Sequence, residues 1–177
     1  MTSRKVKEPL PGQAYPIQKS NLTVRVTKST IVFIQWKNTG DMMEKHIEIL
    51  YERFGKDSLL ALATVDEKGI PWVRTIDAIF FKGSFYTITY ALSNKVKHIE
   101  NNAAVALSGE WFSGHALAIS LGYIKLEENR DIADKLRAAF ASWYDNGHTN
   151  EDDPNTIILK MELTDGILFD NGIKYEF

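Results

Sequence analysis

The chain has 177 residues, of which 44% are hydrophobic and 25% are charged, a composition typical of a soluble globular protein of about one domain. It contains no cysteine, which excludes disulfides, thiolate metal sites and a cysteine nucleophile. The formal net charge of −2 at pH 7 provides no overall attraction for nucleic acid or anionic lipid.

Residues 1–40 are expected to form an N-terminal extension that precedes a single domain at residues 41–177. Residues 1–18 are polar, contain three prolines and lack the apolar run of a signal peptide. Apolar and polar residues alternate from Leu22 to Thr27, and an apolar run follows at residues 31–34 before Trp36, which predicts one or two extra strands in the extension. No segment approaches the ~20 apolar residues of a membrane span. We therefore expect a soluble, cytoplasmic protein.

The first helix is expected to begin near Asp41, which is a suitable cap, and to end at Gly55. Its apolar residues recur at the spacing of one helical face, and they are Met43, Ile47, Leu50, Tyr51 and Phe54.

Three strands joined by tight turns are predicted next, at residues 59–65, 72–81 and 84–90. The turns are residues 66–69, where Gly69 is free to adopt a positive φ, and residues 82–83.

In the second half, two helices are inserted between pairs of strands. Helices are expected at residues 93–101, capped by Ser93, and at 128–143. Strands are expected at residues 103–107, 116–126, 156–163 and 166–169, with a turn at residues 164–166 between the last two. The total of about seven or eight strands, mostly in hairpins, with three inserted helices favours a mainly β fold: an antiparallel barrel with peripheral helices.

Four polar side chains in the middle of the chain are candidates for binding a phosphate. Arg74 and Thr89 lie on neighbouring predicted strands about 4.8 Å apart, and Ser93 and Lys95 lie in the first turn of the next helix. The start of a helix presents free N–H groups and the positive end of its dipole. One guanidinium, one ammonium, two hydroxyls and backbone amides would together bind a monophosphate.

The ordered series of residues around this site resembles the FMN-binding split-barrel superfamily. That superfamily includes pyridoxamine-phosphate oxidase, the general stress protein 26-like flavoproteins and the nitroimidazole-resistance-type proteins. The resemblance covers residues 44–169, and it rests on Leu62-Ala63-Thr64-Val65-Asp66, Gly69-Ile70-Pro71, Val73-Arg74-Thr75, Phe85-Tyr86, Thr89, Ser93-Asn94-Lys95, Ile99-Glu100-Asn101-Asn102 and Val105-Ala106-Leu107.

The resemblance implies FMN as the cofactor and a homodimer with each FMN between two subunits. Arg74 and the segment Ser93-Asn94-Lys95 would lie at the phosphate, and Thr89 would contact the phosphate or the ribityl chain. Backbone groups of Thr75-Ile76-Asp77 would flank the isoalloxazine ring. Trp111 and the strand at residues 117–120 would face the flavin from the second subunit.

Three departures separate this chain from the biosynthetic oxidases. Asn94 replaces an arginine, Ile79 replaces a lysine, and Ala116-Leu117 replaces an Arg-Gln pair. The Arg-x-His substrate signature of those enzymes is also absent from residues 166–177. Each lost charged hydrogen bond is worth about 1.5–3 kcal/mol. We therefore expect weaker phosphate binding and a reaction other than pyridoxamine phosphate oxidation.

Two functional hypotheses remain open from the sequence. The first is an FMN-dependent oxidoreductase for a small molecule, in which no residue is assigned a catalytic role. The second is a non-catalytic module that binds flavin or haem for sensing or storage, and a deazaflavin is a third ligand of the same fold. His115, close to Trp111, is either a proton donor, an axial haem ligand or a loop histidine without a role. No pair of histidines has metal-ligand spacing, so no metal site is expected.

Overall fold

The structure is a computed structural model that describes residues 39–147 and 149–177. The extension at residues 1–40, with its expected strands, lies almost entirely outside this range. The described strands are β1 (Ser58–Val65), β2 (Pro71–Phe81), β3 (Ser84–Tyr90), β4 (Ala104–Gly109), β5 (Phe112–Tyr123), β6 (Thr156–Asp170) and β7 (Ile173–Glu176). The helices are α1 (Thr39–Phe54), α2 (Asn94–Asn101), α3 (Arg130–Ala139) and the short 3-10 helix η1 (Glu127–Asn129).

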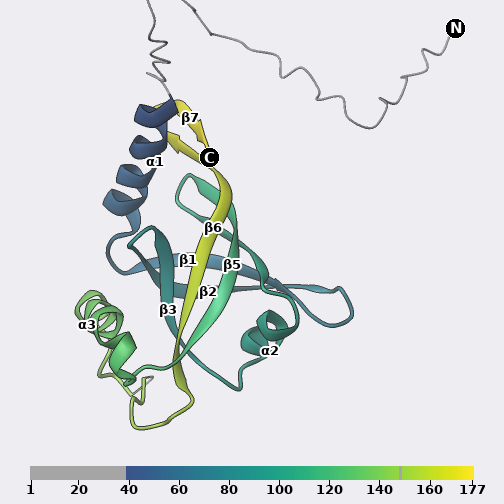
Figure 1. The fold of residues 1–177 in the computed structure, drawn as a ribbon, viewed down its shortest axis with the longest axis vertical. Coiled ribbons are helices and arrows are strands. Elements are labelled where there is room, and N and C mark those ends of the chain that lie inside the picture. The colour runs from purple at the N-terminus through teal and green to yellow at the C-terminus, as the bar shows by residue number, and fades with distance from the viewer. Residues whose placement is uncertain (1–38, 148) are drawn as a thin grey trace, which may run out of the picture. The chain divides into compact units, whose positions relative to one another are not determined.

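Six of the strands close into an antiparallel barrel. Their order is β3-β2-β1-β4-β5-β6, and pairing of β3 with β6 closes the ring, while β7 extends the sheet beyond β6. Figure 1 shows α1 at the end of the barrel that carries β7, and α2 and α3 toward the opposite end. The predicted antiparallel barrel with peripheral helices is confirmed.

The barrel wall opens at two places on either side of the β1–β2 hairpin. Pairing of β1 with β4 ends at Ala63 and Ala106, so the last residues of β1 separate from the start of β4. Pairing of β2 with β3 covers only residues 79–81 and 84–86. Along residues 71–78, no strand in the described part of the chain pairs with the edge of β2 that faces away from β1. Backbone N–H and C=O groups on that edge are available to a ligand.

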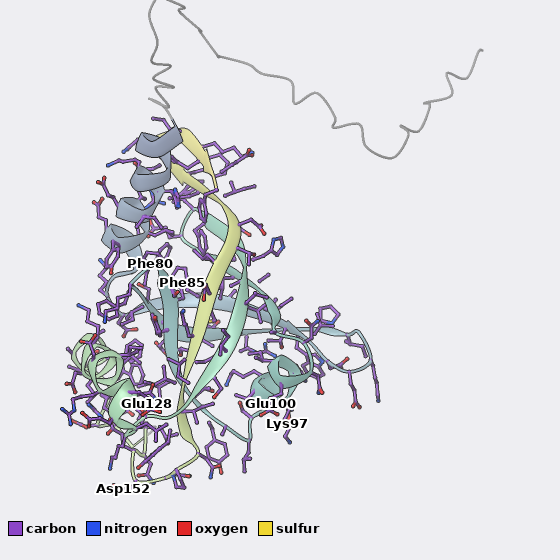
Figure 2. The ribbon with its side chains drawn as sticks, in the orientation of Figure 1. Phe80, Phe85, Lys97, Glu100, Glu128 and Asp152 are labelled. Carbon is purple, nitrogen blue, oxygen red and sulfur yellow. The ribbon has the colours of Figure 1, made fainter. Side chains whose placement is uncertain are left out.

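The core follows from the alternation of side chains along each strand. Leu60 and Leu62 of β1 point into the barrel, where Phe80 and Phe85 meet with ring centroids 5.0 Å apart. Figure 2 shows these two rings in the barrel interior. On the outer side, Ile79 packs beneath α3 in a second apolar cluster. Each face of β2 is therefore buried over part of its length, and this fixes the register of the strand.

The turn expected near the end of the chain was wrong. Strand β6 runs without a break through residues 164–166, where a turn was expected. The additional residue Thr164 is absorbed as a register shift opposite His115 and Ala116, which is the geometry of a β-bulge. The chain instead turns at Asn171-Gly172, where φ is 47° and 79°, and returns as β7.

Three further boundaries differ from the expected ones. Asp41, the expected cap, lies within α1, and β5 begins at Phe112 and ends at Tyr123. The helix expected at residues 128–143 begins as η1 and ends at Ala139. Turns follow it, and from them Trp143 donates a hydrogen bond to Asp57 and the hydroxyl of Tyr144 donates one to Glu151.

Candidate functional site

Arg74 extends from β2 across the barrel wall to β1. It lies opposite Leu62 in the β1–β2 register. Its Nη1 donates hydrogen bonds to the carbonyl oxygen of Leu62 at 3.2 Å and to Oγ1 of Thr64 at 2.7 Å. Burial lowers the pKa of the guanidinium, so the charge is held in surroundings that solvate it poorly.

Lys95 brings a second cation to the same place from α2. Its Nζ donates a hydrogen bond to Oγ1 of Thr89 on β3 at 2.8 Å. Burial lowers the pKa of Lys95, and the positive charge of Arg74 lowers it further. Among the residues that the structure describes, neither cation forms an ion pair with a carboxylate. Two partly buried positive charges without a counter-charge favour an anionic ligand.

Ser93 adds a hydroxyl whose hydrogen-bonding capacity is unused. Its backbone is extended at the start of α2, but its side chain forms no capping bond. The Oγ is buried and has no hydrogen-bond partner among the described residues. Buried hydroxyls are normally satisfied, so this atom is suited to a ligand. The amides of the first turn of α2 point toward the same end of the helix.

These observations bring most of the predicted phosphate residues together in what we call the cationic cradle. The cradle consists of Arg74, Thr89, Ser93 and Lys95. Asn94, at the first position of α2, is exposed. The donor set fits a phosphate monoester, because it offers two cations, hydroxyls and helix amides without an opposing carboxylate. Phosphate binding itself stays a prediction.

The three residues expected to flank a flavin ring lie on β2 beside the cradle. Ile76 is buried in the barrel core, so only its backbone can reach a ligand. Thr75 is exposed on the outer face, and Asp77 is partly buried there. Burial raises the pKa of Asp77, and the nearby charge of Asp57 raises it further. All three residues belong to the stretch of β2 with the unpaired backbone edge.

Trp111 is not part of the cradle in this chain. It lies in the turn between β4 and β5 with a φ of 54°, and 70% of its surface is exposed. The turn is at the end of β4 that is remote from α2. A contact between Trp111 and a ligand in the cradle would therefore have to come from a second subunit, as the sequence resemblance implies.

Sequence reasoning missed two residues that lie behind the cradle. Thr64, at the end of β1, is buried and receives the hydrogen bond from Arg74. His98, one turn beyond Lys95 on α2, has its Nδ1 3.0 Å from Oγ1 of Thr64. Alternation along β1 assigns Thr64 to the inner face with Leu62. That alternation was the only available signal, because His98 comes from an element 34 residues away.

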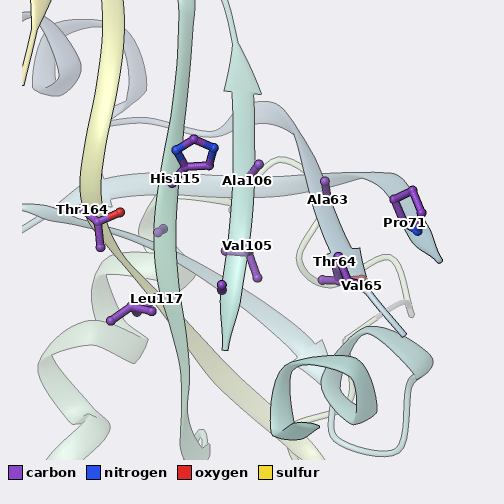
Figure 3. A pocket seen from close by; sticks show the side chains of 11 residues that line it. Ala63, Thr64, Val65, Pro71, Val105, Ala106, His115, Leu117 and Thr164 are labelled. Atoms are coloured by element: carbon purple, nitrogen blue, oxygen red, sulfur yellow. The ribbon is translucent and has the colours of Figure 1, made fainter. Parts of the chain in front are cut away.

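His115 lines a groove on the outer side of the barrel, and this groove also includes Thr64, the partner of Arg74. Its Nδ1 lies 2.7 Å from Oδ1 of Asp165, and this contact lowers the pKa of Asp165. The groove has a volume of about 290 Å³ and follows the opening between β1 and β4 (Figure 3). Its lining is mostly apolar, and it consists of Ala63, Thr64, Val65, Pro71, Ala104, Val105, Ala106, His115, Ala116, Leu117 and Thr164.

Metal-binding clusters and membrane-spanning helices are both absent from the described ranges. No group of three or more histidine and acidic side chains there has the geometry to hold a metal ion. No helix of the described residues is long and apolar enough to cross a membrane.

Comparison with known proteins places this geometry in a family. Residues 46–169 match the family model of pyridoxamine 5'-phosphate oxidase. Among curated proteins, none matches the chain.

Solved structures share the fold at low sequence identity. General Stress Protein 26 from Bacillus anthracis is 17% identical, with 68% of this chain and 91% of that chain covered and a TM-score of 0.52. A FAD-binding protein from Mesorhizobium loti is 11% identical, with coverage of 67% and 90% and a TM-score of 0.54. A heme binding protein from Mycobacterium smegmatis is 11% identical, with coverage of 74% and 57% and a TM-score of 0.56.

Proposed function

Since the chain belongs to the pyridoxamine 5'-phosphate oxidase family, we propose that it is an FMN-binding flavoprotein that acts as an oxidoreductase on a small molecule. The observation that carries this proposal is the pair of partly buried cations, Arg74 and Lys95, with no acidic partner in the described part of the chain. The unpartnered hydroxyl of Ser93 supports it, because it adds a neutral donor beside the two charges.

The cradle supports a phosphate monoester as the ligand. A guanidinium and an ammonium offer charge-assisted hydrogen bonds, each worth about 1.5–3 kcal/mol. Nη1 of Arg74 donates both of its hydrogen bonds to groups on β1. Nη2 and Nε can therefore donate to two oxygens of one phosphate. Lys95 and Ser93 would contact the remaining oxygens from the start of α2.

The unpaired edge of β2 supports a place for the isoalloxazine ring next to the phosphate. Backbone groups of residues 75–77 would donate to and accept from the ring without any special side chain. The bound flavin would supply hydride transfer. The protein would orient the ring along the unpaired edge of β2.

The substrate is proposed to differ from that of the biosynthetic oxidases. Ile79, in the position of their second lysine, is buried beneath α3, where a cation would lose its solvation. Ala116 points into the core, and Leu117 is exposed, so the Arg-Gln pair has no polar equivalent. Asn94 is also neutral, so the arginine, the lysine and the Arg-Gln pair of those enzymes all lack a counterpart here.

We further propose that the chain forms a homodimer through the outer face of β2, β1, β4 and β5. Large apolar side chains are exposed on this face, with 67% of the surface of Leu59 and 69% of that of Val73 accessible. Leu117 and Ile119 of β5 are each 47% exposed and extend the same face. An apolar patch across four neighbouring strands is typical of a protein interface. The interface would bring a second subunit to the flavin edge of β2.

The alternative is a non-catalytic module that binds flavin or haem for sensing or storage. The specific observation in its favour is His115, whose imidazole is exposed and held by Asp165, an arrangement that orients a histidine as a metal ligand. The structural similarity to a heme binding protein is consistent with this alternative.

The absorbance spectrum of the purified protein tests these functions. We expect flavin bands, either as purified or after addition of FMN, and no haem Soret band. Anaerobic addition of NADH or NADPH, followed by an electron acceptor, then separates the two roles. Cycles of bleaching and recovery of the flavin bands support the oxidoreductase. Bound flavin that neither reductant bleaches favours the module, and a protein that binds no flavin overturns the proposal.

A further inference from the structure

We propose that Thr64 and His98 are positioning residues that hold the guanidinium of Arg74 in the orientation that binds a phosphate. This inference rests on the proposed function, because it names the second layer of the same site. Neither residue touches the expected phosphate oxygens. Both act through Arg74.

Thr64 is enclosed by the protein. Only 1% of its surface is exposed, so its hydroxyl must find its partners within the protein. Nη1 of Arg74 donates to its Oγ1 at 2.7 Å, which occupies one lone pair. The single hydroxyl proton is then free to be donated, and Nδ1 of His98 lies 3.0 Å from the same oxygen. The hydroxyl of Thr64 has all its hydrogen bonds when Nδ1 of His98 accepts its proton. This requires the imidazole tautomer that is protonated at Nε2.

The side chain of Arg74 is anchored to β1 in the absence of a ligand. An arginine side chain that is ordered only on ligand binding loses up to about 2 kcal/mol of rotamer entropy at that moment. Here Nη1 is held by two acceptors on β1, the carbonyl of Leu62 and the hydroxyl of Thr64. No described residue accepts a hydrogen bond from Nη2 or Nε of Arg74. The guanidinium is therefore anchored on one nitrogen and open along the edge that binds a phosphate in bidentate fashion.

His98 connects helix α2 to strand β1 through Thr64. His98 and Lys95 lie three residues apart on α2, so they face the same side of that helix. Lys95 is bonded to β3 and His98 to β1, and these two contacts fix the start of α2 between the strands. In Figure 2, Lys97 and Glu100 lie on the outer side of α2. The indole of Trp72 covers His98 at a centroid distance of 6.1 Å and is itself held by Asp66.

The test compares FMN with riboflavin, which carries the same ring without the phosphate. Thr64→Val preserves the shape of the side chain and removes its hydroxyl, and Thr64→Ser preserves the hydroxyl. We expect Thr64→Val to weaken FMN binding about five- to twentyfold while riboflavin affinity changes by less than about twofold. Thr64→Ser should bind FMN within about threefold of wild type. Far-ultraviolet circular dichroism and the melting temperature confirm that each variant is folded.

His98 provides a second, independent variant because it lies closer to the surface than Thr64. His98→Phe keeps a planar ring and removes the acceptor, and His98→Gln restores an acceptor. We expect a selective loss of FMN affinity in the first variant and partial recovery in the second.

A double-mutant cycle of Thr64 and Arg74 tests whether Thr64 affects FMN binding through Arg74. If it does, Thr64→Val has no further effect on FMN affinity in the Arg74→Ala background. Additive losses would overturn the inference, as would equal losses for FMN and riboflavin or unchanged FMN affinity in Thr64→Val. If wild type itself binds FMN no more tightly than riboflavin, it is the proposed phosphate site that fails.

Discussion

The ammonium of Lys95 donates a hydrogen bond to the hydroxyl of Thr89 at 2.8 Å, and this bond holds it beside the guanidinium of Arg74 and away from any carboxylate in the described ranges. Folding thus brings two like charges together in a partly buried place, where their mutual repulsion is poorly screened. A protein accepts such a cost where binding of an anion offsets it. The cradle is therefore the feature from which most of our predictions follow.

Arg74→Ala should abolish the preference for a phosphorylated flavin. The expected loss of FMN affinity is tenfold or more, equivalent to at least about 1.4 kcal/mol. Riboflavin affinity should stay within about twofold, because that ligand has no phosphate to lose. Fluorescence quenching of each flavin on titration with protein measures both constants. An equal loss for the two flavins would remove Arg74 from the phosphate site.

Lys95→Met should stabilise the ligand-free protein at neutral pH while it weakens FMN binding. The pKa of Lys95 is lowered by burial and by Arg74, so the charged form costs stability in the folded state. That cost is present in full below the lowered pKa and is relieved as pH rises toward the ordinary value of 10.5. We expect a gain of about 1–3 °C in melting temperature at pH 7, which disappears above about pH 10.5.

Differential scanning calorimetry of the two proteins without ligand measures this effect. Saturating FMN should reverse the order of stability, since wild type gains more from the ligand. A lower melting temperature for ligand-free Lys95→Met at pH 7 would contradict the account of the cradle.

Glu151→Gln should destabilise the fold in a pH-dependent way. Glu151 accepts hydrogen bonds from Nε and Nη2 of Arg137 at 2.7 and 2.9 Å and also bonds the hydroxyl of Tyr144. The bonds from Arg137 hold the pKa of Glu151 below its ordinary value of 4.5. The resulting stability is fully present above pH 4.5 and is lost as pH falls through the lowered pKa.

We expect Glu151→Gln to lose about 1–3 kcal/mol of unfolding free energy at pH 7. The difference from wild type should shrink below about pH 4. Urea denaturation across this pH range measures it, and a difference that is independent of pH would contradict the ionic role of Glu151. FMN affinity should be unaffected at pH 7, because this network is not part of the cradle.

Leu117→Glu should convert the proposed dimer to a monomer. A carboxylate in the middle of an apolar interface would be desolvated without a partner. Leu126→Glu is the matched control, because Leu126 is 38% exposed but precedes η1, outside the proposed interface. Sedimentation velocity at micromolar concentration should show a dimer for wild type and control and a monomer for Leu117→Glu. A monomeric wild type would contradict the proposed interface.

The barrel strands could be predicted because their signals are local. The apolar run of β1, the apolar end of β2 and the Asp66–Gly69 turn between the strands specify this hairpin without reference to the rest of the chain. The carboxylate of Asp66 accepts hydrogen bonds from the backbone amides of Lys68 and Ile70. Aspartate is favoured in turns for this reason, so the turn could be recognised from the sequence. Arg74, Ser93 and Lys95 could be grouped for the same reason, because they follow one another on consecutive elements.

The features that were missed depend on partners distant in the sequence. Thr164-Asp165-Gly166 has the composition of a turn, but pairing with β5 on one side keeps it extended as a bulge. Gly166 has a tertiary role, since a Cβ there would lie 2.7 Å from the ring of Phe177. The contact between Thr64 and His98 joins β1 to α2 and has no local signature either.

The measurement that tests the central claim most directly is the affinity of the wild-type protein for FMN relative to riboflavin. If Arg74, Lys95 and Ser93 form a phosphate site, FMN should bind at least about tenfold more tightly, a difference of about 1.4 kcal/mol or more. That preference should decline with added inorganic phosphate, which competes for the cradle. Equal affinity for the two flavins, with no effect of phosphate, would contradict the claim that the cradle binds a flavin phosphate.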